Sequence, residues 1–184
     1  MTLLPTPGAG FDQPFELLAA CHDRVRRTLD LLQRLRSHLD SHGADTQAQQ
    51  AAHDVMRYFD IAAPAHHEDE ERHVFPALLA ADAATHGPLV ARLQDDHRRM
   101  AALWPAVRAG LAAVADGRWP CTPDPSAHWA DFAALYDGHL PAEDDLAYPA
   151  AVAVIDVARQ AGMGDEMARR RGLTGVKADP PGEA

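Results

Sequence analysis

The sequence predicts an all-α protein, folded as an up-down-up-down four-helix bundle with a short C-terminal extension. Ala, Leu and Arg dominate the 184 residues and β-branched residues are scarce, a composition that favours helix. Helix-breaking stretches divide the chain into four long pieces with short connections, and four such helices pack most simply when neighbours run antiparallel. Each piece also carries apolar residues spaced by three and four, the pattern of a helix that buries one stripe.

Clusters of Gly, Pro and Asp mark the predicted helix ends. The first helix begins near Pro14, because proline suits a first helical turn. The four helices end at the breakers DSHGAD at 40–45, DAATHGP at 82–88, DGRWPCTPDP at 116–125 and QAGMGD at 160–165. These ends predict an N-terminal arm over 1–13, the bundle over 14–160, and a short helix, EMARRRG, with a disordered tail over 161–184.

Composition limits the class of protein and its partners. The length suits one domain with a single core. A net charge of -10, from 27 acids against 17 bases, argues against nucleic acid or an anionic membrane as a partner. Cys21 and Cys121 are too few for a disulfide framework, and neither a signal-like N-terminus nor a run of 18 apolar residues is present. We therefore expect a soluble, cytoplasmic protein.

Polar residues interrupt the apolar stripe of every helix. They are His22 in the first helix, His66, Glu70 and His73 in the second, His97 in the third, and His139 and Glu143 in the fourth. Counting from the connecting turns places one such residue of each helix at the same level, since each residue rises about 1.5 Å. Buried carboxylates and imidazoles require mutual neutralisation or a cation, and a cation is the simpler solution.

An internal repeat supports a single polar site. HHEDEERHVFP at 66–76 and HLPAEDDLAYP at 139–149 share the frame His-x3-Glu-x4-aromatic-Pro, and the spacing of four places His and Glu on one helical face. Four imidazoles and two carboxylates, which can bridge, suit two first-row metal ions such as iron, manganese or zinc. The predicted metal ligands are His22, His66, Glu70, His97, His139 and Glu143.

The other histidines and acids near the motifs are expected to be solvated. They are His38, His42, His53, His67, His86 and His128, with Glu68, Asp69, Glu71, Asp144 and Asp145. His73 lies on the stripe, and three roles stay open for it: a fifth imidazole ligand, a hydrogen-bond partner of a ligand, or a buried neutral histidine. Tyr136 is expected to pack in the core, and Cys21 to be structural.

The doubled motif resembles the hemerythrin-like, HHE cation-binding family over about residues 14–160. The resemblance implies a non-haem di-iron centre, oxo- or hydroxo-bridged, held by the six predicted ligands. It also implies a small gaseous or peroxide ligand, because members carry O2, sense O2, NO, redox state or iron, or repair iron centres. Oxygen carriers have a further histidine one turn after the third-helix histidine, and here that position is Ala101.

We therefore expect a di-iron protein that reacts with or senses O2, NO or peroxide, or handles iron, and whether it is an enzyme stays open. The second hypothesis is a metal-stabilised regulatory bundle, an iron or redox sensor without catalysis. A metal phosphohydrolase of the HD type is weaker, because Asp23 and Asp54 of its two HD dipeptides lie off the stripe. A ferritin-like enzyme is weaker too, since Glu70-x-x-His73 has no counterpart at Leu146.

Overall fold

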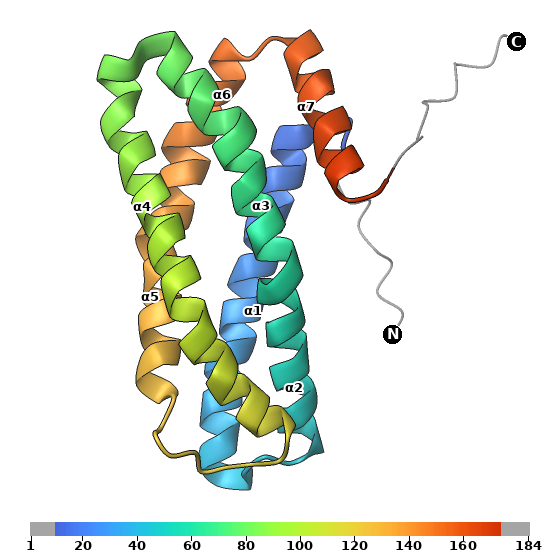
Figure 1. Cartoon of the computed structure of the whole chain (residues 1–184), viewed down its shortest axis with the longest axis vertical. Helices are drawn as coiled ribbons and strands as arrows, with labels where there is room; N and C mark the ends of the chain where they lie inside the picture. The colour runs from blue at the N-terminus through green and yellow to red at the C-terminus, as the bar shows by residue number, and fades with distance from the viewer. Residues whose placement is uncertain (1–9, 174–184) are drawn as a thin grey trace, which may run out of the picture.

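The computed structural model describes residues 10–173, and these residues form an all-helical bundle (Figure 1). The α-helices are α1 (Pro14–His42), α2 (Thr46–Arg57), α3 (Ala63–Asp69), α4 (Phe75–Ala115), α5 (Ser126–Ala142), α6 (Tyr148–Val154) and α7 (Val157–Arg170). Three π-helical segments connect some of them: η1 (Tyr58–Ala62), η2 (Glu70–Val74) and η3 (Glu143–Ala147). The predicted four-helix bundle is confirmed, whereas most of the predicted arm and tail lies outside the described residues.

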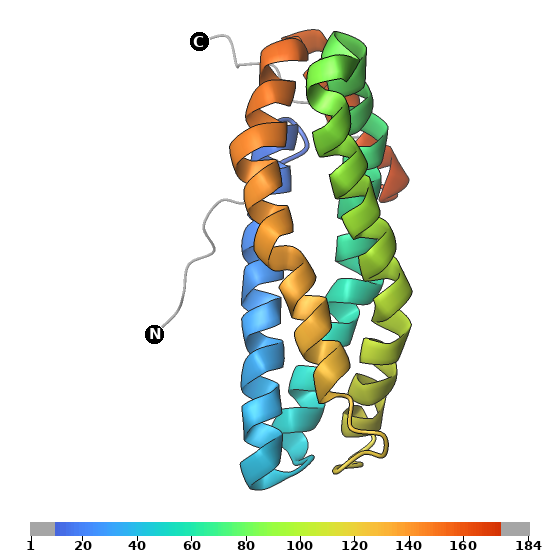
Figure 2. The same ribbon diagram turned by 90° about the vertical axis from the view of Figure 1, so that its left-hand side faces the viewer.

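Four long rods build the bundle, and several elements share a rod. The first is α1, and the second runs through α2, η1, α3, η2 and the start of α4. The third is the rest of α4, after its kink at Asp82. The fourth combines α5, η3 and α6, which lie end to end in the rotated view of Figure 2. The short α7 packs beside the upper part of the second rod (Figure 1).

The turn between the second and third rods lies inside α4. Asp82 has non-helical backbone angles, φ -160° and ψ 93°, and its carboxylate accepts bonds from the backbone N–H groups of Ala84 and Thr85. These bonds cap a new helix at the predicted breaker. By length and mean hydropathy, a window within Thr46–Ala115 would suit a membrane span. That stretch forms the second and third rods here, and the expected lack of membrane contact stays a prediction.

The predicted end of the fourth helix at 160–165 is wrong. The helix stops at Val154, and the Asp156 side chain accepts a bond from the Arg159 backbone N–H and starts α7. The breaker QAGMGD lies inside α7. Gly164 occurs there for a packing reason, because an added Cβ would lie 1.7 Å from the carbonyl oxygen of Phe11.

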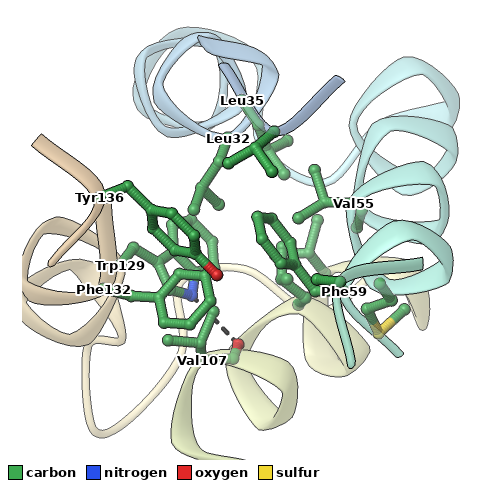
Figure 3. Close-up of a cluster of buried hydrophobic side chains, with 14 of the residues drawn as sticks. Leu32, Leu35, Val55, Phe59, Val107, Trp129, Phe132 and Tyr136 are labelled. Atoms are coloured by element: carbon green, nitrogen blue, oxygen red, sulfur yellow. Dashed lines mark hydrogen bonds between the residues drawn. The ribbon is translucent and has the colours of Figure 1, made fainter. Parts of the chain in front are cut away.

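Two apolar cores lie on either side of a polar layer. Toward the 116–125 loop, Figure 3 shows Phe59 and Phe132 packed edge to face, with ring centroids 5.0 Å apart and Leu32 nearby. Toward the Asp82 turn, a second core includes Leu18, Phe75 and Met167. Each large buried side chain contributes roughly 1.5–3 kcal/mol relative to exposure. The cores thus hold four rods rigidly around the residues between them.

Candidate metal centre

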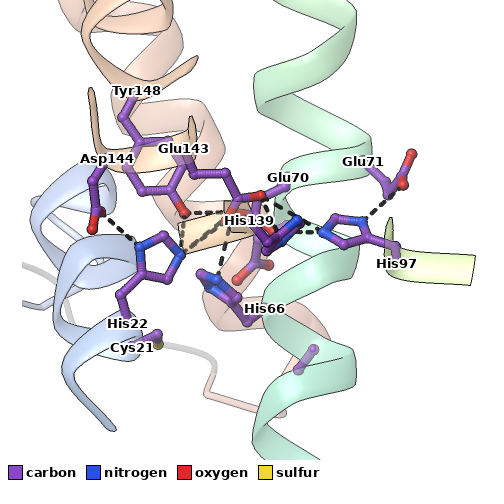
Figure 4. A network of polar contacts seen from close by, with 12 residues as sticks. Cys21, His22, His66, Glu70, Glu71, His97, His139, Glu143, Asp144 and Tyr148 are labelled. Atoms are coloured by element: carbon purple, nitrogen blue, oxygen red, sulfur yellow. Dashed lines mark hydrogen bonds and ion pairs between the residues drawn. The ribbon is translucent and has the colours of Figure 1, made fainter. Parts of the chain in front are cut away.

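The six residues singled out in the sequence lie together in the polar layer (Figure 4). All are buried: the exposed fraction is 0% for His22, Glu70 and Glu143, and at most 7% for the other three. Every rod contributes at least one of them, and the second and fourth rods contribute a His/Glu pair each. The level matching inferred from turn positions therefore holds in the structure.

Glu143 faces imidazoles on both sides of the cluster. Its Oε2 lies 3.2 Å from Nε2 of His22, and its Oε1 lies 3.1 Å from Nε2 of His139. The same Oε1 lies 3.7 Å from Nε2 of His97. One carboxylate therefore reaches both sides through two different oxygens.

Glu70 is arranged in the same way. Its Oε1 lies 3.5 Å from Nε2 of His66 and 4.0 Å from Nε2 of His22. Its Oε2 lies 3.5 Å from Nε2 of His97. The imidazoles thus fall into a first pair, His22 and His66, and a second pair, His97 and His139. Each pair receives one oxygen from each glutamate.

The inward atoms fit the requirements of metal ions. Among residues 10–173, the buried atoms without a hydrogen-bond partner include Nε2 of His66, His97 and His139, Oε2 of Glu70 and both carboxylate oxygens of Glu143. Leaving such groups unpaired in an apolar interior costs several kcal/mol. Two donor atoms at about 2.1 Å from one ion and at right angles to each other lie about 3 Å apart. The spacings of Glu143 from His22 and His139, 3.2 and 3.1 Å, are close to that value, and the other spacings between imidazole nitrogens and carboxylate oxygens are 3.5–4.0 Å.

Three of the four inward imidazoles have a carboxylate beside the outer nitrogen. The contacts are His22 Nδ1 to Asp144 Oδ1 at 2.7 Å, His97 Nδ1 to Glu71 Oε1 at 3.0 Å and His139 Nδ1 to Asp96 Oδ2 at 3.5 Å. At His22 and His97 the outer acceptor is within hydrogen-bond distance, so it keeps the proton on Nδ1 and directs the Nε2 lone pair inward, as in most protein metal sites. Asp96 lies beside His139 but makes no hydrogen bond with its Nδ1. The prediction that Glu71 and Asp144 are solvated is therefore wrong.

Comparison with known proteins agrees with this geometry. Residues 13–151 match the family model described as the hemerythrin HHE cation binding domain. The chain belongs to this family. An uncharacterized protein of Haemophilus influenzae is 30% identical over 145 residues, which covers 78% of this chain and 82% of that relative. The predicted resemblance is confirmed, and the buried His and Glu groups indicate a metal site in this HHE domain.

Protons balance the buried charge when the HHE domain holds no metal. Burial alone would lower the pKa of His97, but the negative carboxylates of Glu143 and Glu70 beside its Nε2 outweigh burial and raise the pKa to about 10. The same competition between burial and the nearby Glu143 carboxylate raises the pKa of His22. Burial opposes ionisation of Glu143 too, yet the close imidazoles of His139, His22 and His97 hold the pKa of Glu143 well below its usual value. Burial lowers the pKa of His66.

Both glutamates of the HHE domain stand at the start of a π-helical segment. Glu70 begins η2 and Glu143 begins η3. A π turn holds one more residue than an α turn, which shifts the buried stripe by one position. The buried position that the sequence assigns to His73 is therefore taken by Val74, and Leu146, expected on the buried stripe, is 55% exposed. The predicted stripe is wrong at both positions.

His73 lies outside the cluster, where its Nε2 lies 2.7 Å from Glu166 Oε2 on α7. Of the three roles left open, this contact supports none, because His73 touches no predicted ligand. It attaches the second rod to α7. Asp69, predicted to be solvated, is 1% exposed and accepts hydrogen bonds from Arg170 and Arg171 beyond α3. The sequence carried no signal for this pairing, because it joins distant segments.

His67 is half-buried, so its predicted surface position is wrong. Its ring stacks on His97, with centroids 4.0 Å apart and planes 14° apart. Ligand atoms of His67, His97 and His139 lie within 4.8 Å of one another. An imidazole lone pair lies in the ring plane, so two parallel stacked rings cannot direct their lone pairs at one ion. We therefore assign His67 to the wall of the site and not to its ligands.

Tyr148 was singled out only as the aromatic residue of the repeat frame. Its hydroxyl donates a hydrogen bond to Glu70 Oε1 and lies 3.1 Å from Nε2 of His22. Its ring stacks on His22 with centroids 5.2 Å apart. The other repeat has Phe75 in this place, stacked at 5.6 Å on His97. The first imidazole pair thus has a hydroxyl beside it, and the second pair does not.

Proposed function

We propose that this HHE domain holds two non-haem iron ions and reacts with or senses a small oxidant: O2, NO or peroxide. The observation that carries the proposal is the arrangement of Glu70 and Glu143. Each presents one oxygen to the first imidazole pair and the other to the second. Carboxylates that face two imidazole pairs suit two neighbouring ions of a metal that accepts mixed nitrogen and oxygen ligands.

Each ion would be held by two imidazoles and one oxygen from each glutamate. Iron held in this way supplies reversible one-electron chemistry and, with four protein ligands, open positions for a small molecule. Ala101, at the position where oxygen carriers have another histidine, is exposed and has no donor atom. The ligand set therefore favours reaction or sensing over carriage of O2.

The surrounding residues of the chain orient the ligands and exclude water. Glu71 accepts a second bond from Gln94 at 2.7 Å while it holds the outer nitrogen of His97. Asp144 likewise accepts from Arg26 while it holds His22. These second contacts fix the carboxylates, and supporting bonds of this kind tune metal affinity. The Tyr148 hydroxyl places a proton beside Glu70.

Metal analysis of protein purified without oxygen tests the proposal. We expect two iron atoms per chain and a near-ultraviolet absorption band that appears when air is admitted. Protein reconstituted anaerobically with ferrous iron that retains one ion or none per chain would contradict the two-ion site. Two bound ions with no spectral change in O2, NO or peroxide would contradict the reactivity and leave the site itself intact.

One observation favours the second hypothesis, a regulatory bundle that senses iron or redox state. Asp69 precedes Glu70, and its hydrogen bonds with Arg170 and Arg171 tie the site to the end of α7. A change in the second rod on metal binding would reach α7 through these contacts. Limited proteolysis distinguishes the two: a sensor shows metal-dependent cleavage of α7, and a purely reactive site shows none.

A further inference from the structure

A cavity of about 560 Å³ opens beside the second imidazole pair, between the second, third and fourth rods. Its walls are mainly aromatic and sulfur-containing: Phe59, Met100, Trp104, Phe132 and Tyr136. His67 and His97 also line it. The cavity therefore reaches the candidate metal centre from the side without Tyr148.

The size of the cavity exceeds the needs of O2, NO or hydrogen peroxide. A water molecule occupies about 30 Å³ in the liquid, and a cavity of about 150 Å³ is enough for benzene. A volume of about 560 Å³ lies in the usual range of pockets for small organic ligands. The polar lining includes Glu68 and Glu71 with negative charge and Arg98 with positive charge, a mixture that favours a neutral ligand.

The aromatic wall is fixed before any ligand arrives. The Trp104 indole N–H donates to Asp60 Oδ1 at 2.9 Å, and Arg108 Nε donates to the same carboxylate at 3.0 Å. Phe59 packs against Trp104 with ring centroids 5.2 Å apart. A pre-formed wall lowers the entropy lost on binding.

Among residues 10–173, two polar side chains of the cavity make no hydrogen bond or ion pair, His67 and Tyr136. The ring of His67 is held by the stack on His97 and lines the cavity. One neutral hydrogen bond from a ligand to a half-buried imidazole raises the affinity of that ligand about fivefold. The lining thus presents two hydrogen-bonding positions beside several aromatic faces, and His67, stacked on His97 at 4.0 Å, is the one directly against the second imidazole pair.

We propose that this cavity binds a small neutral aromatic molecule with one hydroxyl group, a phenol. Its ring lies among Phe59, Trp104 and Phe132, and its hydroxyl meets His67 next to the second imidazole pair. The binding depends on the cavity and on His67, and not on which metal the neighbouring site holds. It can therefore be tested apart from the proposed function.

The test uses 4-fluorophenol and fluorobenzene as probes, with fluorine NMR titrations of the protein as purified. We expect 4-fluorophenol to bind about fivefold more tightly than fluorobenzene, because only the phenol has a hydroxyl for His67. His67→Phe keeps a ring at the position and should bring both probes to the affinity of fluorobenzene. This variant should keep its full metal content, which separates loss of the hydrogen bond from damage to the site.

A second pair of variants tests the location. Ala101 lines the cavity, and Ala101→Trp should weaken 4-fluorophenol at least tenfold by filling it. Ala102, exposed on the same helix and outside the cavity, gives the matched control Ala102→Trp, which should bind like the unmodified protein. Equal binding by the two tryptophan variants, or no binding at millimolar probe, would overturn the proposal. An unchanged preference for the phenol in His67→Phe would overturn the role of His67.

Discussion

Metal uptake by this HHE domain should expel protons. In the metal-free chain the pKa of His97 is raised to about 10 and that of His22 is also raised, in both cases because carboxylate contacts outweigh burial. A protonated imidazole has no free lone pair, so it has to lose its proton before it binds an ion. The buried carboxylates that attract the metal are thus the same groups that first attract protons.

The expected size of the effect follows from these two histidines. At pH 7 His97 is almost wholly protonated, whereas burial lowers the pKa of His66 and leaves it neutral. Filling the site should therefore release about one proton from His97 and up to one more from His22. Each displaced proton lowers the apparent metal affinity about tenfold for each unit that the pH falls. The apparent affinity for the pair of ions should therefore fall by up to about a hundredfold per pH unit.

Calorimetric titration of the metal-free protein with zinc, which is redox-silent, measures the release. Titrations at one pH in two buffers with different ionisation enthalpies give the number of protons transferred to the buffer. His53→Gln, a change at an exposed histidine of α2, should leave that number unchanged. Heats that do not depend on the buffer would refute the reasoning, because His97 and His22 would then be neutral before metal arrives.

Three further predictions concern metal content and stability. In metal analysis, the Glu143→Ala variant should contain neither ion, because Glu143 faces both imidazole pairs. The control variant Glu68→Ala changes a half-exposed residue and should retain both ions. The double variant Arg170→Ala, Arg171→Ala leaves the buried charge of Asp69 unpaired and should lower the free energy of unfolding by roughly 3–5 kcal/mol in denaturant titrations; an unchanged midpoint would show that Asp69 finds another partner. Metal-free protein should lose thermal stability as pH rises from about 6.5 to about 10. The reason is that the pKa of His97 is higher in the folded protein than in the unfolded chain, so its protonation stabilises the fold fully below the unfolded pKa, and this stabilisation is lost as pH rises through the folded pKa. Metal-loaded protein should lack that decline in its melting temperature.

The sequence predicted the bundle and the six clustered residues because both depend on position along a helix. The spacing of the buried stripe and the distance from a turn can both be counted along the sequence. His22 and His97 are therefore placed at one level without knowledge of the packing. The outer acids were missed for the opposite reason. Asp144 contacts His22 from another rod, and only the rotation of that rod brings it there. A usable signal did exist, since Glu71 and Asp144 each directly follow a predicted glutamate ligand.

The C-terminal helix was misread because local chemistry and tertiary packing disagreed. Two glycines in QAGMGD predict a break, and in isolation they weaken a helix by about 1 kcal/mol each. In the structure the Asp156 cap starts α7, and Met163 and Met167 bury against the second core. Gly164 lets the backbone of Phe11 approach closely, so the same residue that disfavours the helix permits its packing.

The repeat frame itself encodes the π turns. In a regular helix the aromatic residue five positions after the glutamate would point about 140° away from it. The N–H groups of Phe75 and Tyr148 instead bond to the carbonyls of Glu70 and Glu143, five residues back, and both rings return over the imidazoles.

The proline that follows each aromatic residue gives the physical reason for the wider turn. Proline has no N–H, and its ring clashes with the carbonyl four residues earlier in an α-helix. All three π segments end just before an X-Pro pair, at Pro64, Pro76 and Pro149. Proline alone is not sufficient, because Pro105 lies within α4 without a π segment beside it. The x4 spacing and the proline thus act together to place an aromatic ring against each side of the candidate metal centre.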